Sequence, residues 1–200
     1  RYYGGGLVTF PSPVTEDGAV SFHFVGGQYE KGSARINQPE ARTLVKDLVA
    51  RLKSPGFQRS GLTIGVVTFN SEQQRLIEDL LDAERRKDPG LEPFFSEIEL
   101  EPVFVKNLES VQGDERDVIF ISTTFGKVIG TDKVRQNFGP ISRPDGWRRL
   151  NVLFTRSKRR IELFTSLSPE DIVVDEKTPL GTKALRDYLD FAKRGVLVTT

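Results

Sequence analysis

The feature that most constrains the fold is a pair of short, almost entirely apolar runs that stand between polar turns. Residues 62–69 (Leu-Thr-Ile-Gly-Val-Val-Thr-Phe) and residues 117–123, around Val118-Ile119-Phe120-Ile121, carry too few polar side chains for strands with one face in water. Strands buried on both faces are typical of parallel sheets that helices cover. We therefore expect an α/β chain with a mostly parallel sheet.

Helices are expected between the strands because apolar residues recur there at helical spacing. Residues 39–52 show this pattern, with Asn37 in the cap region. Asn70 follows the first apolar run as an N-cap, with Gln73 three residues later, and this helix should reach about Arg86. We expect further strands at residues 19–25, 103–105 and 160–164, a polar loop at 126–146, and further helices at 147–157, after Ser168, and at 182–193.

Composition excludes several kinds of site. The 200 residues include no Cys and one His, which rules out disulfides, a Cys nucleophile and the common zinc sites. The formal net charge is +1, so any nucleic acid must be attracted by a local patch. With no membrane-length apolar run and no leader, the sequence predicts a cytoplasmic protein without membrane contact. The chain starts at Arg1 and lacks Met, so we expect a piece of a longer protein.

Charge is distributed unevenly along the chain. Residues 72–101 contain ten acids and four bases, which is most simply a solvated helix face. Residues 143–160 contain seven bases and one acid. Because apolar residues are interleaved with these Arg residues, the guanidinium groups cannot all face bulk water. We therefore favour a functional role for the basic segment.

Two polar segments adjoin the apolar strands. Residues 66–73 end a strand and start a helix, and ligands of open α/β sheets gather at such strand ends, although an ordinary capped helix has the same pattern. Residues 110–117 precede the second apolar strand. There Gly113 lets the backbone turn or approach a ligand, and Gln112 and Glu115 can hydrogen-bond one. A plain polar turn remains the alternative.

A third segment, residues 148–158, is basic and has helical spacing. Arg149, Val152, Leu153 and Arg156 fall at positions i, i+3, i+4 and i+7, which places them on one stripe of the expected helix. A planar guanidinium on a rigid helix is a good phosphate ligand. The alternative is a surface Arg pair with a structural ion pair.

In this order the three segments resemble motifs IV, V and VI of superfamily-one nucleic-acid helicases. The subgroup is the one typified by the RNA-decay and immunoglobulin-switch-region helicases. Motif V is similar to Gln112-Gly113-x-Glu115-x-Asp117, and motif VI to Arg149-Leu150-Asn151-Val152-x-x-Thr155-Arg156. The loop Phe138-Gly139-Pro140 and the opening Tyr2-Tyr3-Gly4-Gly5-Gly6-Leu7 also fit. Residues 167–200 look like a segment of large bacterial multidomain members.

The resemblance implies a RecA-like, three-layer αβα fold with helices on both faces of the sheet. It divides the chain into a lead-in at residues 1–19, a second RecA-like domain at 20–166 and a C-terminal helical appendage at 167–200. Such a domain belongs to an ATP-dependent helicase or translocase, with ATP in the cleft shared with a first RecA-like domain. The chain lacks the sequence G-x-x-x-x-G-K-[ST], so Mg²⁺ is expected in that first domain, and this chain alone should not hydrolyse ATP.

The resemblance also implies roles for individual residues. Arg156 matches the catalytic arginine finger. The other expected nucleotide-binding residues are Gln112, Gly113, Glu115 and Arg149. The residues expected to contact single-stranded nucleic acid, with DNA favoured over RNA, are Thr68, Asn70, Ser110 and Arg148. Ser157-Lys158 replaces the family's frequent Ala-Arg, which leaves the role of Lys158 open.

Other interpretations remain open. A non-enzymatic nucleic-acid-binding module that kept the fold is the main alternative to a motor domain, and a nuclease is a weaker one. The run Ile172-Val173-Val174-Asp175-Glu176 mimics a magnesium-binding strand, but no phosphate loop precedes it, and we expect no metal site in this chain. His23 lies between two Phe residues and is expected to be structural.

Overall fold

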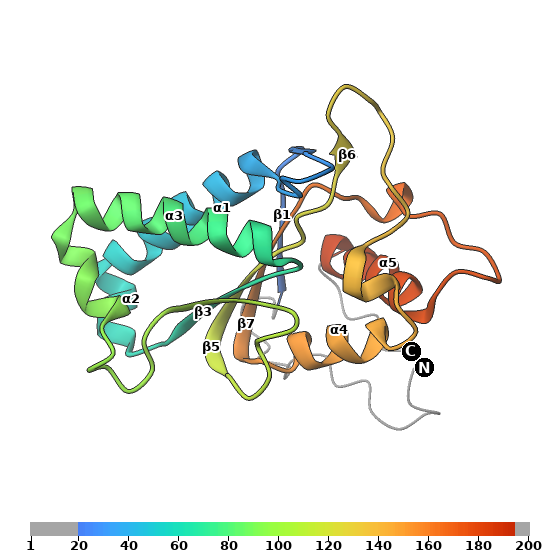
Figure 1. Ribbon diagram of the computed structural model, residues 1–200. Coiled ribbons are helices and arrows are strands. Elements are labelled where there is room, and N and C mark those ends of the chain that lie inside the picture. The colour runs from blue at the N-terminus through green and yellow to red at the C-terminus, as the bar shows by residue number, and fades with distance from the viewer. Residues whose placement is uncertain (1–19, 195–200) are drawn as a thin grey trace.

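The computed structural model describes residues 20–194, which form an α/β fold around a five-stranded parallel sheet (Figure 1). The predicted fold class is confirmed, because every neighbouring pair of strands is parallel. The two apolar runs form strands inside the sheet rather than at its edges, which explains their lack of polar residues. Across the sheet the strands are β1 (Val20–Phe24), β7 (Ser157–Thr165), β5 (Arg116–Ser122), β3 (Ile64–Thr68) and β4 (Phe104–Asn107).

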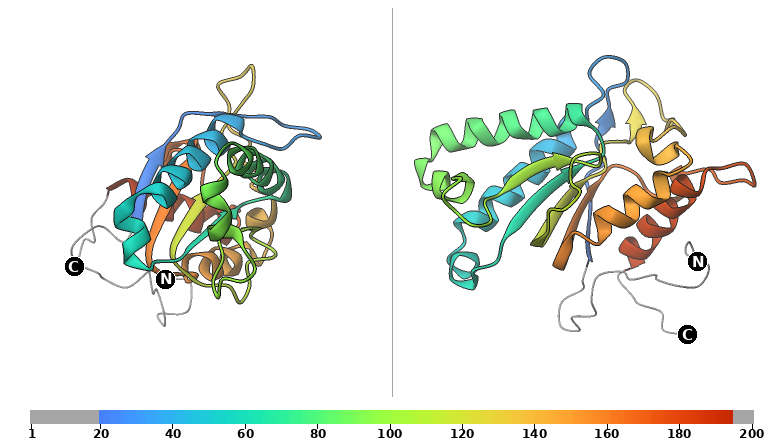
Figure 2. Two further views of the ribbon diagram at one scale, coloured as in Figure 1. Left: turned by 90° about the vertical axis from the view of Figure 1, so that its left-hand side faces the viewer. Right: turned by 60° about the horizontal axis from the view of Figure 1, so that its bottom comes forward.

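Helices cover both faces of the sheet and complete the three layers of a RecA-like fold (Figures 1 and 2). Helices α1 (Gln38–Lys53) and α3 (Ser71–Lys87) pack on one face, and α4 (Gly146–Phe154) and α5 (Leu180–Arg194) on the other. A hydrophobic core lies on each face of the sheet, and alternate strand residues point into one or the other. Val66 packs with α1 and α3, and Val67 with α4 and α5. The remaining elements are short: α2 (Pro55–Ser60) and the 3₁₀ turns η1 (Pro89–Phe95), η2 (Gly139–Ser142) and η3 (Pro169–Asp171).

Both predicted helix caps are present. Asn37 Oδ1 accepts from the Glu40 N–H at 3.2 Å, and Asn70 Oδ1 accepts from the Gln73 N–H at 2.8 Å. These bonds satisfy backbone donors that the first helical turn leaves without an intrahelical partner. The Gln73 side chain does not return to its cap. It is buried and bonds the backbone of Asn37 and the Ser122 hydroxyl.

The connection from β4 to β5 contains no helix. Residues 108–115, which we call the crossing segment, must pass β3 because β3 lies between the two strands. Leu108 and Val111 are buried in the core that α4 and α5 cover, so the segment crosses that face. An ion pair of 2.6 Å between Lys106 Nζ and Asp114 Oδ2 ties its end to β4.

The structure corrects the predicted helix at residues 147–157. Helix α4 ends at Phe154, and β7 begins at Ser157, so Arg156 lies in the turn between them and not on a helical stripe. The reason is a distant pairing. Ser157 is opposite Arg116 of β5 in the sheet, and its hydroxyl bonds the Arg160 and Asp117 carbonyl oxygens.

The predicted helix after Ser168 is also corrected, because it forms only one 3₁₀ turn, η3. Its start is as expected, with the Ser168 N–H donating to Asp171 Oδ2 at 2.8 Å. The Gln136 side chain then bonds the Asp171 carbonyl and the Val173 N–H, both at 2.9 Å. These bonds take backbone groups that a continuing helix would need.

A second, two-stranded parallel sheet lies beside the main one. It pairs β2 (Gln28–Tyr29) with β6 (Lys127–Val128), and β6 lies within residues 126–146, where the sequence predicted only a polar loop. The helix predicted at residues 182–193 is α5, which packs against α4. The predicted lead-in at 1–19, with Tyr2 to Leu7, lies outside the described residues. No helix within residues 20–194 is both long and apolar enough to cross a membrane.

Candidate functional site

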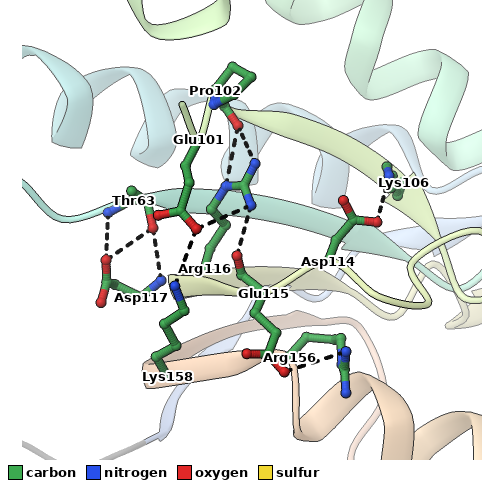
Figure 3. A network of polar contacts seen from close by, with 10 residues as sticks. All are labelled: Thr63, Glu101, Pro102, Lys106, Asp114, Glu115, Arg116, Asp117, Arg156 and Lys158. Carbon is green, nitrogen blue, oxygen red and sulfur yellow. Dashed lines mark hydrogen bonds and ion pairs between the residues drawn. The ribbon is translucent and has the colours of Figure 1, made fainter. Parts of the chain in front are cut away.

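Arg156 and Glu115 meet at the amino ends of β7 and β5 (Figure 3). Arg156 Nη1 lies 3.6 Å from Glu115 Oε1, and the Arg156 side chain is 18% exposed. Its Nε donates to the Val152 carbonyl at 3.0 Å, and its Nη2 to Thr155 Oγ1 at 3.2 Å. Ending α4 at Phe154 therefore fixes the guanidinium at the C-terminus of the helix, where the backbone dipole favours a cation.

A polar network underlies this pair and holds the start of β5. Arg116 is nearly buried, and its guanidinium donates to the Pro102 carbonyl at 2.9 Å and the Glu115 carbonyl at 2.8 Å (Figure 3). Lys158 Nζ lies 3.2 Å from Glu101 Oε1, so this lysine faces an acidic turn in the structure. The network positions the backbone of Glu115 rather than its carboxylate.

Asp117, the second residue of β5, completes the network. Its carboxylate accepts from the Thr63 N–H and the Thr63 hydroxyl, both at 3.0 Å. Partial burial opposes ionisation, but these hydrogen bonds and the charges of Arg159 and Lys158 together lower the pKa of Asp117. The carboxylate is therefore charged at neutral pH and anchors β5 to β3.

Next to this edge, the crossing segment and α4 form a surface hollow of about 280 Å³. Gln112, Arg148 and Arg149 are among the residues that line it. Arg149 Nη1 donates to the Pro140 carbonyl at 3.3 Å, while Arg148 is exposed and lies 5.3 Å above the Trp147 ring. At Gly113 the backbone has a φ of +90°, which favours glycine, and no atom lies within 4 Å of the place a Cβ would take. The segment therefore leaves open space for close approach.

Three of the four residues predicted to contact nucleic acid, Thr68, Asn70 and Ser110, lie at the opposite, carboxyl edge of the sheet, and the fourth, Arg148, lies at the hollow. Thr68 ends β3, but its side chain is buried and its hydroxyl donates to the Asn70 carbonyl at 2.7 Å. Asn70 caps α3 and also donates through Nδ2 to the Arg35 carbonyl at 2.8 Å. Ser110 is exposed, and its Oγ accepts from the Asn107 N–H at 3.1 Å. Asn70 and Ser110 thus present polar atoms at this edge, and Thr68 does not.

The candidate residues form two groups, not one. Arg156 and Glu115 lie at the amino edge, and Arg156 bonds Val152 at one end of the hollow that Gln112, Arg148 and Arg149 also line. Thr68 and Asn70 lie at the carboxyl edge. The crossing segment connects the groups, because the Leu108 N–H donates to the Thr68 carbonyl at 3.0 Å and the other end reaches Glu115.

Sequence reasoning missed a buried polar cluster at the carboxyl edge. Glu40 is fully buried and accepts from Ser122 Oγ and the Thr124 N–H, each at 2.7 Å, and from Ser166 Oγ at 2.9 Å. Burial raises the pKa of Glu40 to about 7. Nothing local marks this residue, because an acid in the first turn of a helix is ordinarily solvated beside the helix dipole.

Two further predictions concern side chains outside both groups. His23 Nε2 lies 2.7 Å from Glu162 Oε2, and the ring stacks on Phe164 with centroids 4.4 Å apart, which is a structural environment. Asp175 Oδ1 accepts from the Thr178 hydroxyl at 2.7 Å in a turn. In residues 20–194 no group of three or more His, Asp or Glu is arranged to hold a metal ion.

Comparison with known proteins adds a family and two relatives. The sequence matches the AAA domain family over residues 13–167. It is 39% identical over 163 residues to a protein of Mycoplasma genitalium named uncharacterized ATP-dependent helicase MG140, and 38% identical over 157 residues to the homolog of that helicase in Mycoplasma pneumoniae. Each match covers 76% of this chain, and the chain spans about 13% of the length of these relatives.

Proposed function

The chain belongs to the AAA domain family, and we propose that it is the second RecA-like motor domain of an ATP-dependent nucleic-acid helicase. The finer placement, in the superfamily-one subgroup typified by the RNA-decay and switch-region helicases, is part of the proposal. The helicase names of the two relatives support the assignment to a helicase. The single observation that carries it is the Arg156–Glu115 pair beside the hollow that Gln112 and Arg149 line.

The residues at the amino edge and at the hollow fit a bound nucleotide. In the proposal Arg156 is the arginine finger, whose charge stabilises the γ-phosphate during phosphoryl transfer. Glu115 accepts a hydrogen bond from a ribose hydroxyl, and Arg149 and Gln112 line the hollow. The open space at Gly113 allows the backbone to approach the ligand. ATP supplies the transferable phosphoryl group, and Mg²⁺ is assigned to a first RecA-like domain elsewhere in the protein.

The carboxyl edge is proposed as part of the single-strand track. Ser110 offers an exposed hydroxyl group and Asn70 a partly exposed amide to a phosphate backbone, with DNA favoured over RNA. Thr68 supports that edge through the backbone of Asn70 instead of touching the strand. Arg148, which is exposed at the hollow, is proposed to contact the same strand. Each contact is to the backbone, so affinity should fall as salt rises.

The decisive test is ATP hydrolysis by the full-length protein with and without single-stranded DNA. Arg156→Ala should reduce strand-stimulated turnover by roughly 10³- to 10⁵-fold, because an arginine finger contributes about that much, while ATP binding measured by fluorescence titration persists. Arg86→Ala is the matched control, since Arg86 is an exposed arginine on α3, on the other face of the sheet.

Near-normal turnover in the Arg156 variant would overturn the assignment of the arginine finger. No turnover in the intact protein, with strand binding unaffected by ATP, would instead support a binding module that kept the fold without the motor.

A further inference from the structure

A small projection extends beyond the carboxyl ends of β1 and β5. We call it the wing and define it as residues 28–36 and 127–135. Its two strands pair in parallel, with Gln28 opposite Lys127 and Tyr29 opposite Val128, and a hairpin-like turn follows each strand. Figure 1 shows the loop after β6 reaching away from the main sheet, and Figure 2 shows the same projection in two further views.

The root of the wing is tightly packed. A Cβ on Gly126 would lie 2.9 Å from the Gly27 carbonyl oxygen, so the two connections leaving the main sheet touch backbone to backbone. Above them the Tyr29 and Phe125 rings lie 5.3 Å apart, and Phe125 meets Phe138 edge-on at 5.5 Å. Aromatic packing of this kind holds the wing in a fixed direction.

The wing is basic and its cations are available. It carries five basic residues and two acids, Glu30 and Asp132. In the part of the chain that the structure describes, three of the basic side chains are exposed and form no ion pair: Lys31, Lys133 and Arg135. Burial raises the pKa of Tyr29, while the charges of Arg35 and Arg135 act to lower it, so both arginines lie near that ring.

The wing also contacts the edge proposed for the nucleic-acid strand. Asn70 Nδ2 donates to the Arg35 carbonyl at 2.8 Å, and the Arg35 guanidinium pairs with Glu72 in the first turn of α3. A strand that reaches Asn70 therefore lies beside a projection that carries three exposed cations without an ion pair and a net positive charge.

We propose that the wing binds the sugar-phosphate backbone of single-stranded nucleic acid through Lys31, Lys133 and Arg135, and so extends the track at Asn70 outward from the sheet. This inference rests on the proposed function of that edge. Three exposed cations suit phosphates and carry no base-reading geometry, so the contact adds affinity without sequence preference.

The test is fluorescence anisotropy with a fluorescein-labelled oligo(dT) strand and the chain at several salt concentrations. The triple variant Lys31→Ala, Lys133→Ala, Arg135→Ala should bind roughly tenfold more weakly or worse, and the slope of log affinity against log salt should shrink by about 2, as expected for three lost phosphate contacts on a single strand. The control Lys46→Ala, Arg59→Ala, Arg86→Ala removes the same charge from exposed residues of α1, α2 and α3.

The outcomes separate this inference from the proposed function. Weaker binding and a shallower slope in the wing variant alone support it. Equal binding by the wing variant and the unaltered chain overturns the wing while leaving Asn70 and its edge in place. No binding by the unaltered chain at low salt overturns both. Circular dichroism of each variant checks that its helices are intact.

Photo-crosslinking distinguishes direct contact between the wing and the strand from a long-range effect of its charge. The chain has no Cys, so Ser33→Cys in the wing gives a single thiol for a photo-crosslinker. Crosslinking to oligo(dT) from this position, and not from Ser60→Cys at the end of α2, supports direct contact. Binding without any crosslink from Ser33→Cys contradicts it.

Discussion

Glu40 is a fully buried acid whose partners are all neutral. Ser122, Ser166 and the Thr124 N–H donate to its carboxylate, and no cation approaches it in residues 20–194. The hydrogen bonds favour the charged form, but burial is the largest influence and raises the pKa of Glu40 from 4.5 to about 7. The folded chain therefore holds a proton that the unfolded chain releases across this interval.

Glu40 should make stability depend on pH. Because its folded pKa is raised, its contribution is fully present below pH 4.5 and is lost as pH rises through 7. The free energy of unfolding should therefore fall by about 2–3 kcal/mol between roughly pH 5 and pH 8 through this group. Glu40→Gln, which cannot titrate, should lose that component in urea denaturation. Glu97→Gln, at an exposed acid, should keep it, and equal pH slopes in all three proteins would refute the assignment.

Glu162 shows the opposite balance. It is also buried, which by itself would raise its pKa, but a hydrogen bond from His23 and the charges of Arg51 and Arg160 lower the pKa of Glu162. Arg51 Nη2 and Arg160 Nε each lie 2.8 Å from Glu162 Oε1. The pKa values of two buried glutamates of one fold thus shift in opposite directions because one has cationic partners and the other has only neutral hydrogen-bond donors.

At the scale of elements, α4 and α5 meet through backbone contact. Gly146 begins α4, and a Cβ there would lie 1.8 Å from the Ile141 carbonyl oxygen; a Cβ on Gly181 of α5 would lie 2.1 Å from the same atom. Three elements therefore converge on one carbonyl in η2. Only glycine allows this approach without displacing backbone.

Gly146→Ala and Gly181→Ala should each lower the free energy of unfolding by about 1–3 kcal/mol or more, because the new methyl group collides with backbone that cannot rotate away. The control is Gly56→Ala in α2, where no atom lies within 4 Å of a Cβ. That change should be neutral or slightly stabilising. Urea denaturation measures the stability of all three variants. A Gly146 variant as stable as the Gly56 variant would show that α4 can move away from η2 without loss of stability.

The sequence predicted most elements because their signals are local. The apolar run of β3 and the caps Asn37 and Asn70 all act within a few residues. The wrong predictions concern helix ends that are determined by contacts with a distant segment. Ser157 joins β7 because it pairs with Arg116, and Gln136 ends the turn after Ser168, and neither partner is visible from the local pattern.

The same limit applies to the candidate site. The chemistry of Arg156, Glu115 and Gln112 followed from residue types and from the family resemblance. Their separation from Asn70 depends on the path of the crossing segment. That path follows from the order of the strands in the sheet, which the sequence does not reveal. The role of Glu40 depends on its burial, and the wing depends on the pairing of β2 with β6. Neither is predicted by the periodicity of the sequence.

At the scale of the whole molecule, the crossing segment runs from the carboxyl edge of the sheet back to the amino edge. It begins beside Thr68 and ends at Glu115, which pairs with Arg156. In a motor that couples strand binding to hydrolysis, a rigid link between these edges can transmit a shift from one to the other. The ion pair between Lys106 and Asp114 ties the segment to β4 and limits its movement.

Asp114→Asn should therefore weaken the coupling of the full-length protein more than its basal hydrolysis. The change keeps the size of the side chain but removes the charge that Lys106 contacts at 2.6 Å. We expect the stimulation of ATP hydrolysis by single-stranded DNA to fall roughly 2- to 30-fold, equivalent to about 0.5–2 kcal/mol of coupling. Asp82→Asn is the control, since it removes a surface ion pair with Arg85 on α3, away from both edges. If both variants were stimulated as strongly as the unaltered protein, the link would have to run through another part of the molecule.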